Sequence, residues 1–274
     1  LDAEVSEDRE TATLSLPTGQ GVVSAQELLG TDFYDEALTR WATTTGSTAF
    51  ELGRSHDGRP IKALRMGDYA APHLVVLIGR QHPPEVTGAI AMEGFVDSIA
   101  SMLARDPQLG TRYQFFVVPM LNPDGVARGH WRANLGAQDL NRDWGNFTQP
   151  ETQAVKRWLD ALPDDVRPVL MLDFHSTWRN LFYVQGEEAD AKGEQFLTDW
   201  LVGKENAFPG YPFTIEPSNA NPRSGTTKNW FNATYGIPAY TYEAGDDADR
   251  QGSQEAAAAL AESLPAALDA MVAE

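Results

Sequence analysis

Strand-length apolar runs alternate with helical patterns along this chain, and that alternation restricts the fold more than any other feature of the sequence. Residues 74–78, 115–119 and 169–174 are almost wholly apolar, which is typical of strands that are buried on both faces. Helical patterns that begin near Pro83 and Pro150 separate these runs. The sequence therefore predicts an α/β fold, in which helices cover both faces of a central sheet.

Weaker patterns predict the remaining elements. Residues 1–30 are polar and acidic, with one β-like stretch at 11–16, and are expected to form a peripheral arm. Further helices are expected at 35–44, 83–103, 150–162, 194–202 and 228–234 and in the alanine-rich C-terminal segment, further strands at 50–52, 61–65, 181–184 and 239–243, and long loops at 120–144 and 209–227. We expect residues 1–45 to be an arm and a helix that pack on one domain, residues 46–274.

Composition argues against several classes of partner. The net charge is −18 and the isoelectric point is near 4.6, which disfavours nucleic acid and anionic membranes. No apolar run approaches the roughly 18 residues that would span a bilayer. Cysteine is absent, so the chain has neither disulfides nor thiolate metal ligands. The compartment is left open, with export slightly favoured because the chain starts at Leu1 and not at a methionine.

Three candidate site residues follow or close predicted strands. His82 comes after 74–78, His175 follows 169–174, and Glu243 closes 239–243. Because open α/β sheets build their sites at the carboxyl ends of strands, we expect these side chains to meet at one edge. Partial desolvation at the end of an aromatic strand would raise the pKa of Glu243 and make it a better general base. The alternative is a capping or ion-pairing glutamate before a turn.

The motif His82-Pro-Pro-Glu85 supplies two candidate metal ligands three residues apart, and His175 supplies a third. Two histidines and one carboxylate, with an open fourth position, form the ligand set of a catalytic zinc. Metal-bound imidazoles usually donate their second N–H to a carboxylate, and Asp139 and Asp173 are the candidates for that contact. Taken alone, His82 and Glu85 could be ordinary residues at a helix start, and His175 could be bonded to backbone.

One predicted loop gathers the candidate anion-binding residues Arg132, Asn141 and Arg142. Arginine presents a planar fork that binds a carboxylate through two hydrogen bonds, and asparagine adds a neutral donor. Arg132 could instead polarise a carbonyl under attack and stabilise the oxyanion that forms. Surface arginines in an acidic protein are the alternative.

Together these motifs resemble the M14 family of zinc carboxypeptidases over about residues 50–246, and residues 118–142 are especially similar to its cytosolic, deglutamylating branch. The resemblance implies a central mixed, mainly eight-stranded twisted sheet flanked by helices on both faces. It also implies one zinc ion and a peptide substrate with a free C-terminal carboxylate. Each matched residue acquires an expected role: His82, Glu85 and His175 hold the zinc, Arg132 polarises the scissile carbonyl, Asn141 and Arg142 bind the terminal carboxylate, Asp139 orients the first histidine, and Glu243 is the general acid/base.

The chain departs from the family pattern at two places. Pro84 stands where many members have an arginine that contacts the upstream part of the substrate, so we expect no such contact. The family's mobile tyrosine has no clear counterpart, and Tyr211 and Tyr235 are the candidate substitutes.

Side-chain preference depends on a register counted back from Glu243, in which Trp230 aligns with a family tryptophan. This register places Lys228 at the base of the pocket that receives the substrate side chain. A cation there would pair with an acidic side chain, which predicts removal of C-terminal Glu or Asp. An exposed lysine at a helix start is the alternative.

Two other functions fit parts of the same pattern. A zinc amidohydrolase that acts on cell-wall γ-glutamyl peptides or on N-acyl amino acids would share much of the site, although Asn141 and Arg142 favour a substrate with a free carboxylate. A non-catalytic peptide-binding module would keep the fold, but it would have no use for Glu243 beside three metal ligands.

Overall fold

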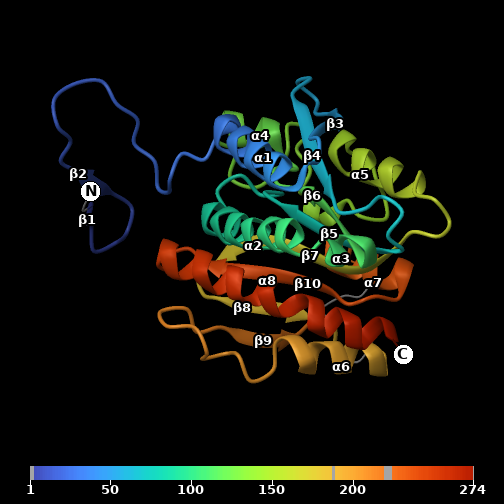
Figure 1. Cartoon of the computed structure of the whole chain (residues 1–274). Helices are drawn as coiled ribbons and strands as arrows, with labels where there is room; N and C mark the ends of the chain where they lie inside the picture. Colours follow the sequence, from blue (N-terminus) through green and yellow to red (C-terminus); the bar gives the residue numbers. More distant parts are fainter. Residues whose placement is uncertain (1–2, 187–188, 219–223, 274) are drawn as a thin grey trace.

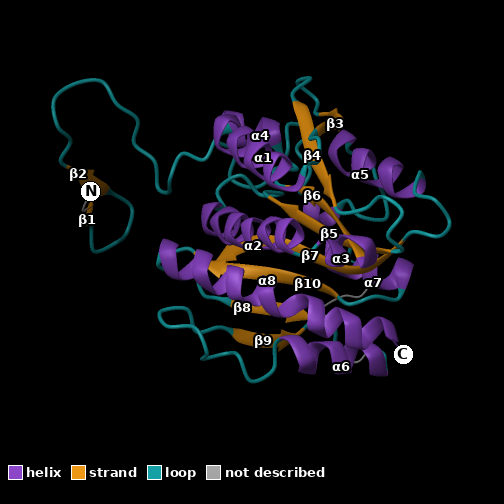
Figure 2. Ribbon diagram, viewed as in Figure 1, coloured by secondary structure: helices purple, strands orange, loops and turns teal. Residues whose placement is uncertain are grey.

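The computed structural model describes residues 3–186, 189–218 and 224–273, and it builds the domain around one mixed eight-stranded sheet (Figure 1, Figure 2). The order across the sheet is β3-β4-β6-β5-β7-β10-β8-β9. The strands are β3 (Phe50–Arg54), β4 (Pro60–Met66), β5 (His73–Gly79), β6 (Tyr113–Val118), β7 (Arg167–Thr177), β8 (Leu181–Val184), β9 (Thr214–Pro217) and β10 (Ala239–Gly245). The predicted sheet is confirmed.

The direction of each strand decides at which edge of the sheet its carboxyl end lies. The central strands β6, β5, β7 and β10 are neighbours in this order and run parallel to one another, whereas β4 and β8 run antiparallel to them. The carboxyl ends of β5, β7 and β10 therefore open on one edge, where α/β folds place their sites. Glu243 of β10 lies opposite His175 of β7 at this edge.

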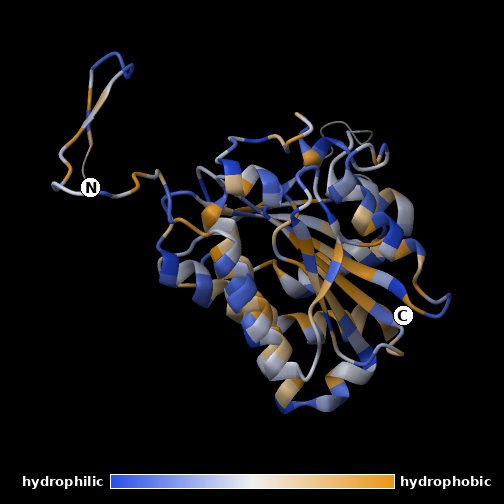
Figure 3. Cartoon of the chain, turned by 90° about the horizontal axis from the view of Figure 1, so that it is seen from above, coloured by the Kyte–Doolittle hydropathy of each residue, from blue (hydrophilic) through white to orange (hydrophobic). Residues whose placement is uncertain are grey.

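Helices cover both faces because alternate residues of each central strand enter different cores. Val75 and Leu77 of β5 join the larger core, while Leu74, Val76 and Ile78 join the smaller one. The larger core is covered by α1 (Thr31–Thr45), α2 (Val86–Arg105), α3 (Pro107–Arg112), α6 (Ala191–Trp200) and α8 (Arg250–Ala273). The smaller core is covered by α5 (Pro150–Asp160) and α7 (Thr227–Tyr235). The strands at the centre of Figure 3 are accordingly mostly apolar.

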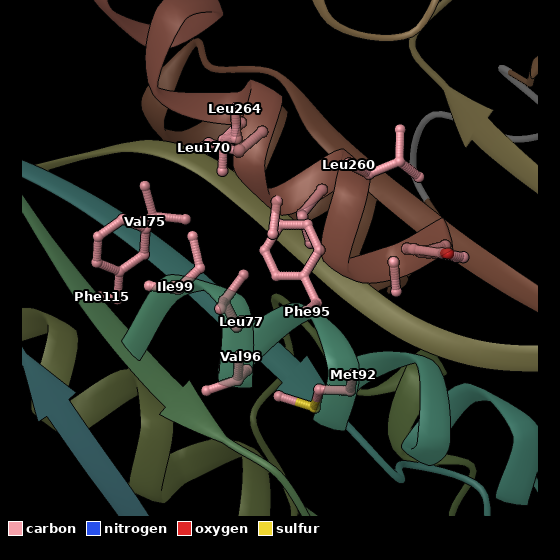
Figure 4. Packing of buried hydrophobic residues seen from close by; sticks show 14 of the residues in the cluster. Val75, Leu77, Met92, Phe95, Val96, Ile99, Phe115, Leu170, Leu260 and Leu264 are labelled. Atoms are coloured by element: carbon pink, nitrogen blue, oxygen red, sulfur yellow. The ribbon is translucent and has the colours of Figure 1, made fainter. Parts of the chain in front are cut away.

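α2 and α8 pack against each other within the larger core. Phe95 and Ile99 of α2, Leu170 of β7, and Leu260 and Leu264 of α8 belong to this one cluster of buried side chains (Figure 4). By length and composition alone, these two helices are the ones among the described residues that could cross a bilayer. The most apolar window of α2 is 72% buried in the fold, so a core position accounts for its apolar character.

The segment before α1 is exposed along most of its length and extends away from the domain (Figure 1). Within it, β1 (Ala3–Val5) and β2 (Ala12–Leu14) form an antiparallel hairpin, of which only one strand was expected. Arg250 of α8 bonds to Gln26 and Glu27 near the end of this arm. The division of the chain at residue 45 stays a prediction.

Several helix boundaries and two predicted loops differ from the structure. α1 begins at Thr31 and not at residue 35, and α6 covers Ala191–Trp200 and not 194–202. α2 begins at Val86, not near Pro83, because His82 and Pro83 each precede a proline and are disfavoured in the α region. The loop predicted at 120–144 contains α4 (Pro123–Arg128), which Asn122 caps by accepting a hydrogen bond from the amide of residue 125. The loop predicted at 209–227 contains β9, and its residues 219–223 lie outside the described residues. α3 was not predicted.

Candidate active site

His82 and Glu85 lie in the loop that joins β5 to α2. Arg80 opens this loop with φ of 52°, in the left-handed region that residues other than glycine rarely adopt. Its buried guanidinium donates to the carbonyl of Pro83 at 2.9 Å and to the Tyr34 hydroxyl of α1. The position of the loop is therefore fixed both by its own backbone and by α1.

A close approach of α2 to β7 brings this loop beside His175. A Cβ atom at Gly88 would lie 2.3 Å from the His175 carbonyl oxygen, so a side chain does not fit there. The Gly88 amide also donates to Ser176 Oγ at 2.8 Å. As a result, the imidazole rings of His82 and His175 have centroids only 4.9 Å apart.

Three candidate ligand atoms converge at this point. The donor atoms of His82, Glu85 and His175 all lie within 4.8 Å of one another. His82 Nδ1 lies 2.7 Å from Glu85 Oε1, and His175 Nδ1 lies 2.7 Å from the other oxygen, Oε2. Burial would raise the pKa of Glu85, but the facing His175 and His82 lower it to about 2, so its carboxylate is ionised. Two imidazoles and one ionised carboxylate fit a zinc ion of the catalytic type.

A carboxylate also orients each imidazole from its second nitrogen. His82 Nε2 lies 2.9 Å from Asp139 Oδ1, and His175 Nε2 lies 2.8 Å from Asp173 Oδ2. A hydrogen held on Nε2 leaves the Nδ1 lone pair for a metal. The structure thus brings Asp139 and Asp173 to the positions expected of them.

Glu243 closes β10 beside the three candidate ligands. Its Oε2 atom is buried and has no hydrogen-bond partner among the described residues. Burial raises the pKa of Glu243 to about 7, with His175 opposing this rise and the carboxylates of Glu85 and Asp173 adding to it. A carboxylate that changes protonation state near neutral pH is suited to accept and return a proton.

The candidate anion-binding residues lie on the loop before α5. Asp139 caps a short 3-10 turn, Leu140–Arg142, by accepting from the amide of Asn141 at 2.9 Å. Arg132 Nε donates to the other oxygen of Asp139 at 2.7 Å. Arg142 Nη1 donates to the Asn141 carbonyl at 2.6 Å. The Asp139 carboxylate therefore contacts His82, Arg132 and the Asn141 backbone and fixes their relative positions.

A cavity of about 450 Å³ joins these groups. Every predicted site residue except Asp139 and Asp173, which stand behind the histidines, lines it. The rest of its wall is polar and comprises Ser176, Thr177, Tyr183, Ser218, Ser224, Thr226, Asn229 and Thr241. A larger cavity of about 850 Å³, near Gln185 and Tyr240, contains none of the predicted residues.

Lys228 lies in the wall of the 450 Å³ cavity and is only 6% exposed. Its ammonium group donates to the carbonyls of Ser218 at 2.8 Å and Val184 at 3.3 Å. The alternative prediction, an exposed lysine at a helix start, is therefore wrong. A buried cation in a cavity wall favours an anionic group beside it.

Several site residues were not predicted from the sequence. Tyr183 of β8 lines the cavity, whereas the candidate tyrosines Tyr211 and Tyr235 do not. Gln81 and Thr227, both fully buried, connect the histidine region to the start of α7. Polar residues directly before His82 and Lys228 were the signal that could have identified this pair.

Comparison of sequences identifies the family that the sequence motifs resemble. A model of the zinc carboxypeptidase family of M14 peptidases matches residues 41–263. The chain is 36% identical over 118 residues to human cytosolic carboxypeptidase 2, which is 41% of this chain and 13% of that protein. It is 33% identical over 152 residues to an uncharacterised protein of Zymomonas mobilis, which is 52% of this chain and 37% of that protein. The matched region thus spans well under half the length of these relatives.

Comparison of structures shows the same fold. A metallo-carboxypeptidase from Burkholderia cenocepacia superposes with a TM-score of 0.71 at 24% identity, covering 89% of this chain and 69% of that one. A metallo-carboxypeptidase from Pseudomonas aeruginosa, solved in complex with (2-guanidinoethylmercapto)succinic acid, gives a TM-score of 0.69 at 22% identity over 88% of this chain and 69% of that one. The family match spans most of the sequence, and the chain belongs to the M14 family of zinc carboxypeptidases.

Proposed function

We propose that this protein is a zinc-dependent carboxypeptidase that removes the C-terminal residue of peptides, with a preference for Glu or Asp at that end. One observation carries the proposal: a single cavity contains the His82, Glu85 and His175 donor atoms, the Glu243 carboxylate and the Asn141-Arg142 pair. The three groups correspond to the three tasks of the reaction, which are activating water, moving a proton and recognising a free carboxylate.

One zinc ion held by His82, Glu85 and His175 would supply Lewis acidity and a water of lowered pKa. Glu243 accepts the proton of the attacking water and returns it to the leaving amine. Arg132, whose Nε is held by Asp139, presents the rest of its guanidinium to the scissile carbonyl oxygen. Asn141 and Arg142 bind the terminal carboxylate, which selects the last peptide bond over internal ones.

The preference for an acidic residue rests on the buried ammonium of Lys228 in the cavity wall. The neighbouring wall residues Tyr183, Asn229 and Thr241 add neutral polar groups that suit a carboxylate better than an apolar side chain. The match to cytosolic carboxypeptidases supports removal of a C-terminal residue, but it covers only part of those proteins.

The first test is product analysis by mass spectrometry with the zinc-loaded protein. The panel contains matched peptides that end in free Glu, Lys or Phe, a peptide with a γ-linked terminal Glu, and C-terminally amidated controls. We expect loss of one residue from the free Glu end, slower loss from the other α-linked ends, and no cleavage of the amidated peptides.

Other products would redirect the assignment. Cleavage of the γ-linked substrate alone would support the amidohydrolase alternative. Cleavage of amidated ends would contradict a role for Asn141 and Arg142 in carboxylate binding. No cleavage by a protein confirmed to hold zinc would contradict the proposed activity and leave the peptide-binding module.

Replacing Lys228 by aspartate is expected to reverse the preference between acidic and basic C-terminal residues. Breaking a desolvated ion pair costs about 2–5 kcal/mol, so kcat/KM for the Glu-ended peptide should fall by at least about thirtyfold. The Lys-ended peptide should become the better substrate because the pocket then carries a negative charge.

The matched control for this change is Lys228→Met, which keeps an unbranched side chain and removes the charge together with the hydrogen bonds to Ser218 and Val184. It should weaken cleavage of the Glu-ended peptide without improving the Lys-ended one. Unchanged ratios of kcat/KM in both variants would show that Lys228 does not contact the substrate side chain.

A further inference from the structure

Thr227 contacts the proposed carboxylate-binding residue Asn141 from behind. Its backbone N–H donates to Asn141 Oδ1 at 2.9 Å, and its hydroxyl lies 3.2 Å from the same oxygen. Thr227 is fully buried and Asn141 is 9% exposed, so solvent does not compete effectively for these contacts. A backbone N–H can only donate, and the atom that it approaches must be the amide oxygen of Asn141.

The direction of the hydroxyl hydrogen follows from a second set of contacts. The indole Nε1 of Trp144, which can only donate, bonds to Gln81 Oε1 at 3.0 Å. The amide nitrogen of Gln81 therefore faces the other way and donates to Thr227 Oγ1 at 2.7 Å. Since Thr227 Oγ1 accepts from Gln81, its own hydrogen is left to donate to Asn141.

These contacts determine which group Asn141 presents to the cavity. With Oδ1 occupied by two donors from Thr227, the NH₂ group is turned toward the site, where Nδ2 lies 3.4 Å from His175 Nε2. That imidazole nitrogen faces the Asp173 carboxylate at 2.8 Å and gives its hydrogen to it, so it does not accept from Asn141. The amide hydrogens of Asn141 are thus directed to a ligand in the cavity.

We propose that Thr227 is a positioning residue that fixes the Asn141 amide with its NH₂ group toward the substrate's terminal carboxylate. This inference rests on the proposed carboxypeptidase function and extends it. In the opposite orientation Asn141 would present its oxygen to a carboxylate, and two acceptors would face each other. Thr227 is also the first residue of α7 and precedes Lys228, so one contact joins carboxylate binding to side-chain binding.

The test compares Thr227→Val, which removes the hydroxyl, with Thr227→Ser, which retains it. On a Glu-ended peptide, Thr227→Val should raise KM about fivefold, the effect of one net hydrogen bond, with kcat within about twofold of wild type. A change confined to KM is expected because the carboxylate is bound equally before and during the reaction. Thr227→Ser should restore KM to within about twofold of the wild-type value.

A double-mutant cycle separates positioning from a general effect on folding. In an Asn141→Ala background, which itself raises KM, adding Thr227→Val should change KM by less than about twofold, because the group being oriented is gone. If the valine variant does not fold, Thr227→Ala, which removes the hydroxyl and the methyl group and places no apolar group beside Gln81 and Asn141, takes its place in the cycle.

The outcomes separate the positioning role of Thr227 from the proposed carboxypeptidase function. A wild-type protein that releases no C-terminal residue would contradict the proposed function itself. An active wild type with an unchanged KM in Thr227→Val, or with effects of Thr227 and Asn141 that simply multiply, would overturn the positioning role alone.

Discussion

Glu243→Gln is expected to lower kcat by about 10²- to 10⁴-fold while the protein keeps its full content of zinc. Glutamine has nearly the same shape as glutamate, but its amide cannot accept the proton of an attacking water or return it to a leaving amine. Glu243 lies beside the His82, Glu85 and His175 donor set without belonging to it, so metal binding should persist. Steady-state kinetics and metal analysis on the same preparation measure the two quantities.

The matched control is Glu216→Gln on the edge strand β9. Glu216 pairs with Arg179 and does not line the cavity, so its variant should keep wild-type kcat. A Glu243→Gln protein with near-wild-type kcat would remove Glu243 from the proton-transfer role. Loss of zinc from that variant would instead show that Glu243 binds the metal.

The sheet could be predicted because its central strands are buried on both faces. The apolar runs at 74–78, 115–119 and 169–174 became β5, β6 and β7, each within a few residues of the expected ends. β9 was missed because it is a half-exposed edge strand that ends in Pro217, where neither pattern nor composition marks a strand. Asn122-Pro-Asp-Gly125 was interpreted as a loop because these residue types favour turns, yet the same Asn and Pro also begin helices.

The candidate site could be predicted as far as single residues carry their own chemistry. His82, His175 and Glu243 were found because each combines a reactive side chain with the end of a strand, and Glu85 was found because it stands three residues after His82. Residues that act through a distant partner were not found. Gln81 meets Thr227 across 146 positions of sequence, and only the packing of α7 against the sheet makes that contact visible.

The burial of Lys228 could likewise not be predicted from the sequence. A lysine in the first turn of a short helix is exposed in most proteins. Here the carbonyl groups of Ser218 and Val184 accept its ammonium hydrogens and keep the charge inside the cavity wall. The pairing of β8 with β9 places Val184 opposite Pro217, next to Ser218, and no local pattern around Lys228 indicates it.

Removal of one metal ligand is expected to lower activity as strongly as the Glu243 change, because zinc binding and catalysis are then lost together. Loss of a carboxylate that only orients a ligating histidine weakens metal affinity or activity by about 10- to 100-fold. Loss of the ligand itself should cost at least the upper end of that range. His175→Ala is therefore expected to raise the Kd for zinc by at least about a hundredfold, and Asp173→Asn by a smaller factor.

Thermal unfolding measured with and without zinc tests this order independently of activity. At a zinc concentration of about 100 Kd, binding to the native state alone stabilises the wild type by about 2.7 kcal/mol, which corresponds to roughly 5–10 °C in Tm. At the same zinc concentration His175→Ala should show a rise in Tm of at most about 1–2 °C, and Asp173→Asn should reach a given rise only at higher zinc concentration. The rise is compared within each variant because replacing the buried His175 also lowers Tm directly.

His73→Ala is the matched histidine control. His73 begins β5, the strand whose other end leads to the loop with His82 and Glu85, so it tests a histidine change on the same element but away from the cavity. Its zinc-dependent rise in Tm and its kcat should match the wild type. A rise retained in His175→Ala, or lost equally in His73→Ala, would contradict the ligand assignment. If His175→Ala keeps the zinc-dependent rise in Tm but loses catalysis, His175 takes part in the reaction and does not bind the metal.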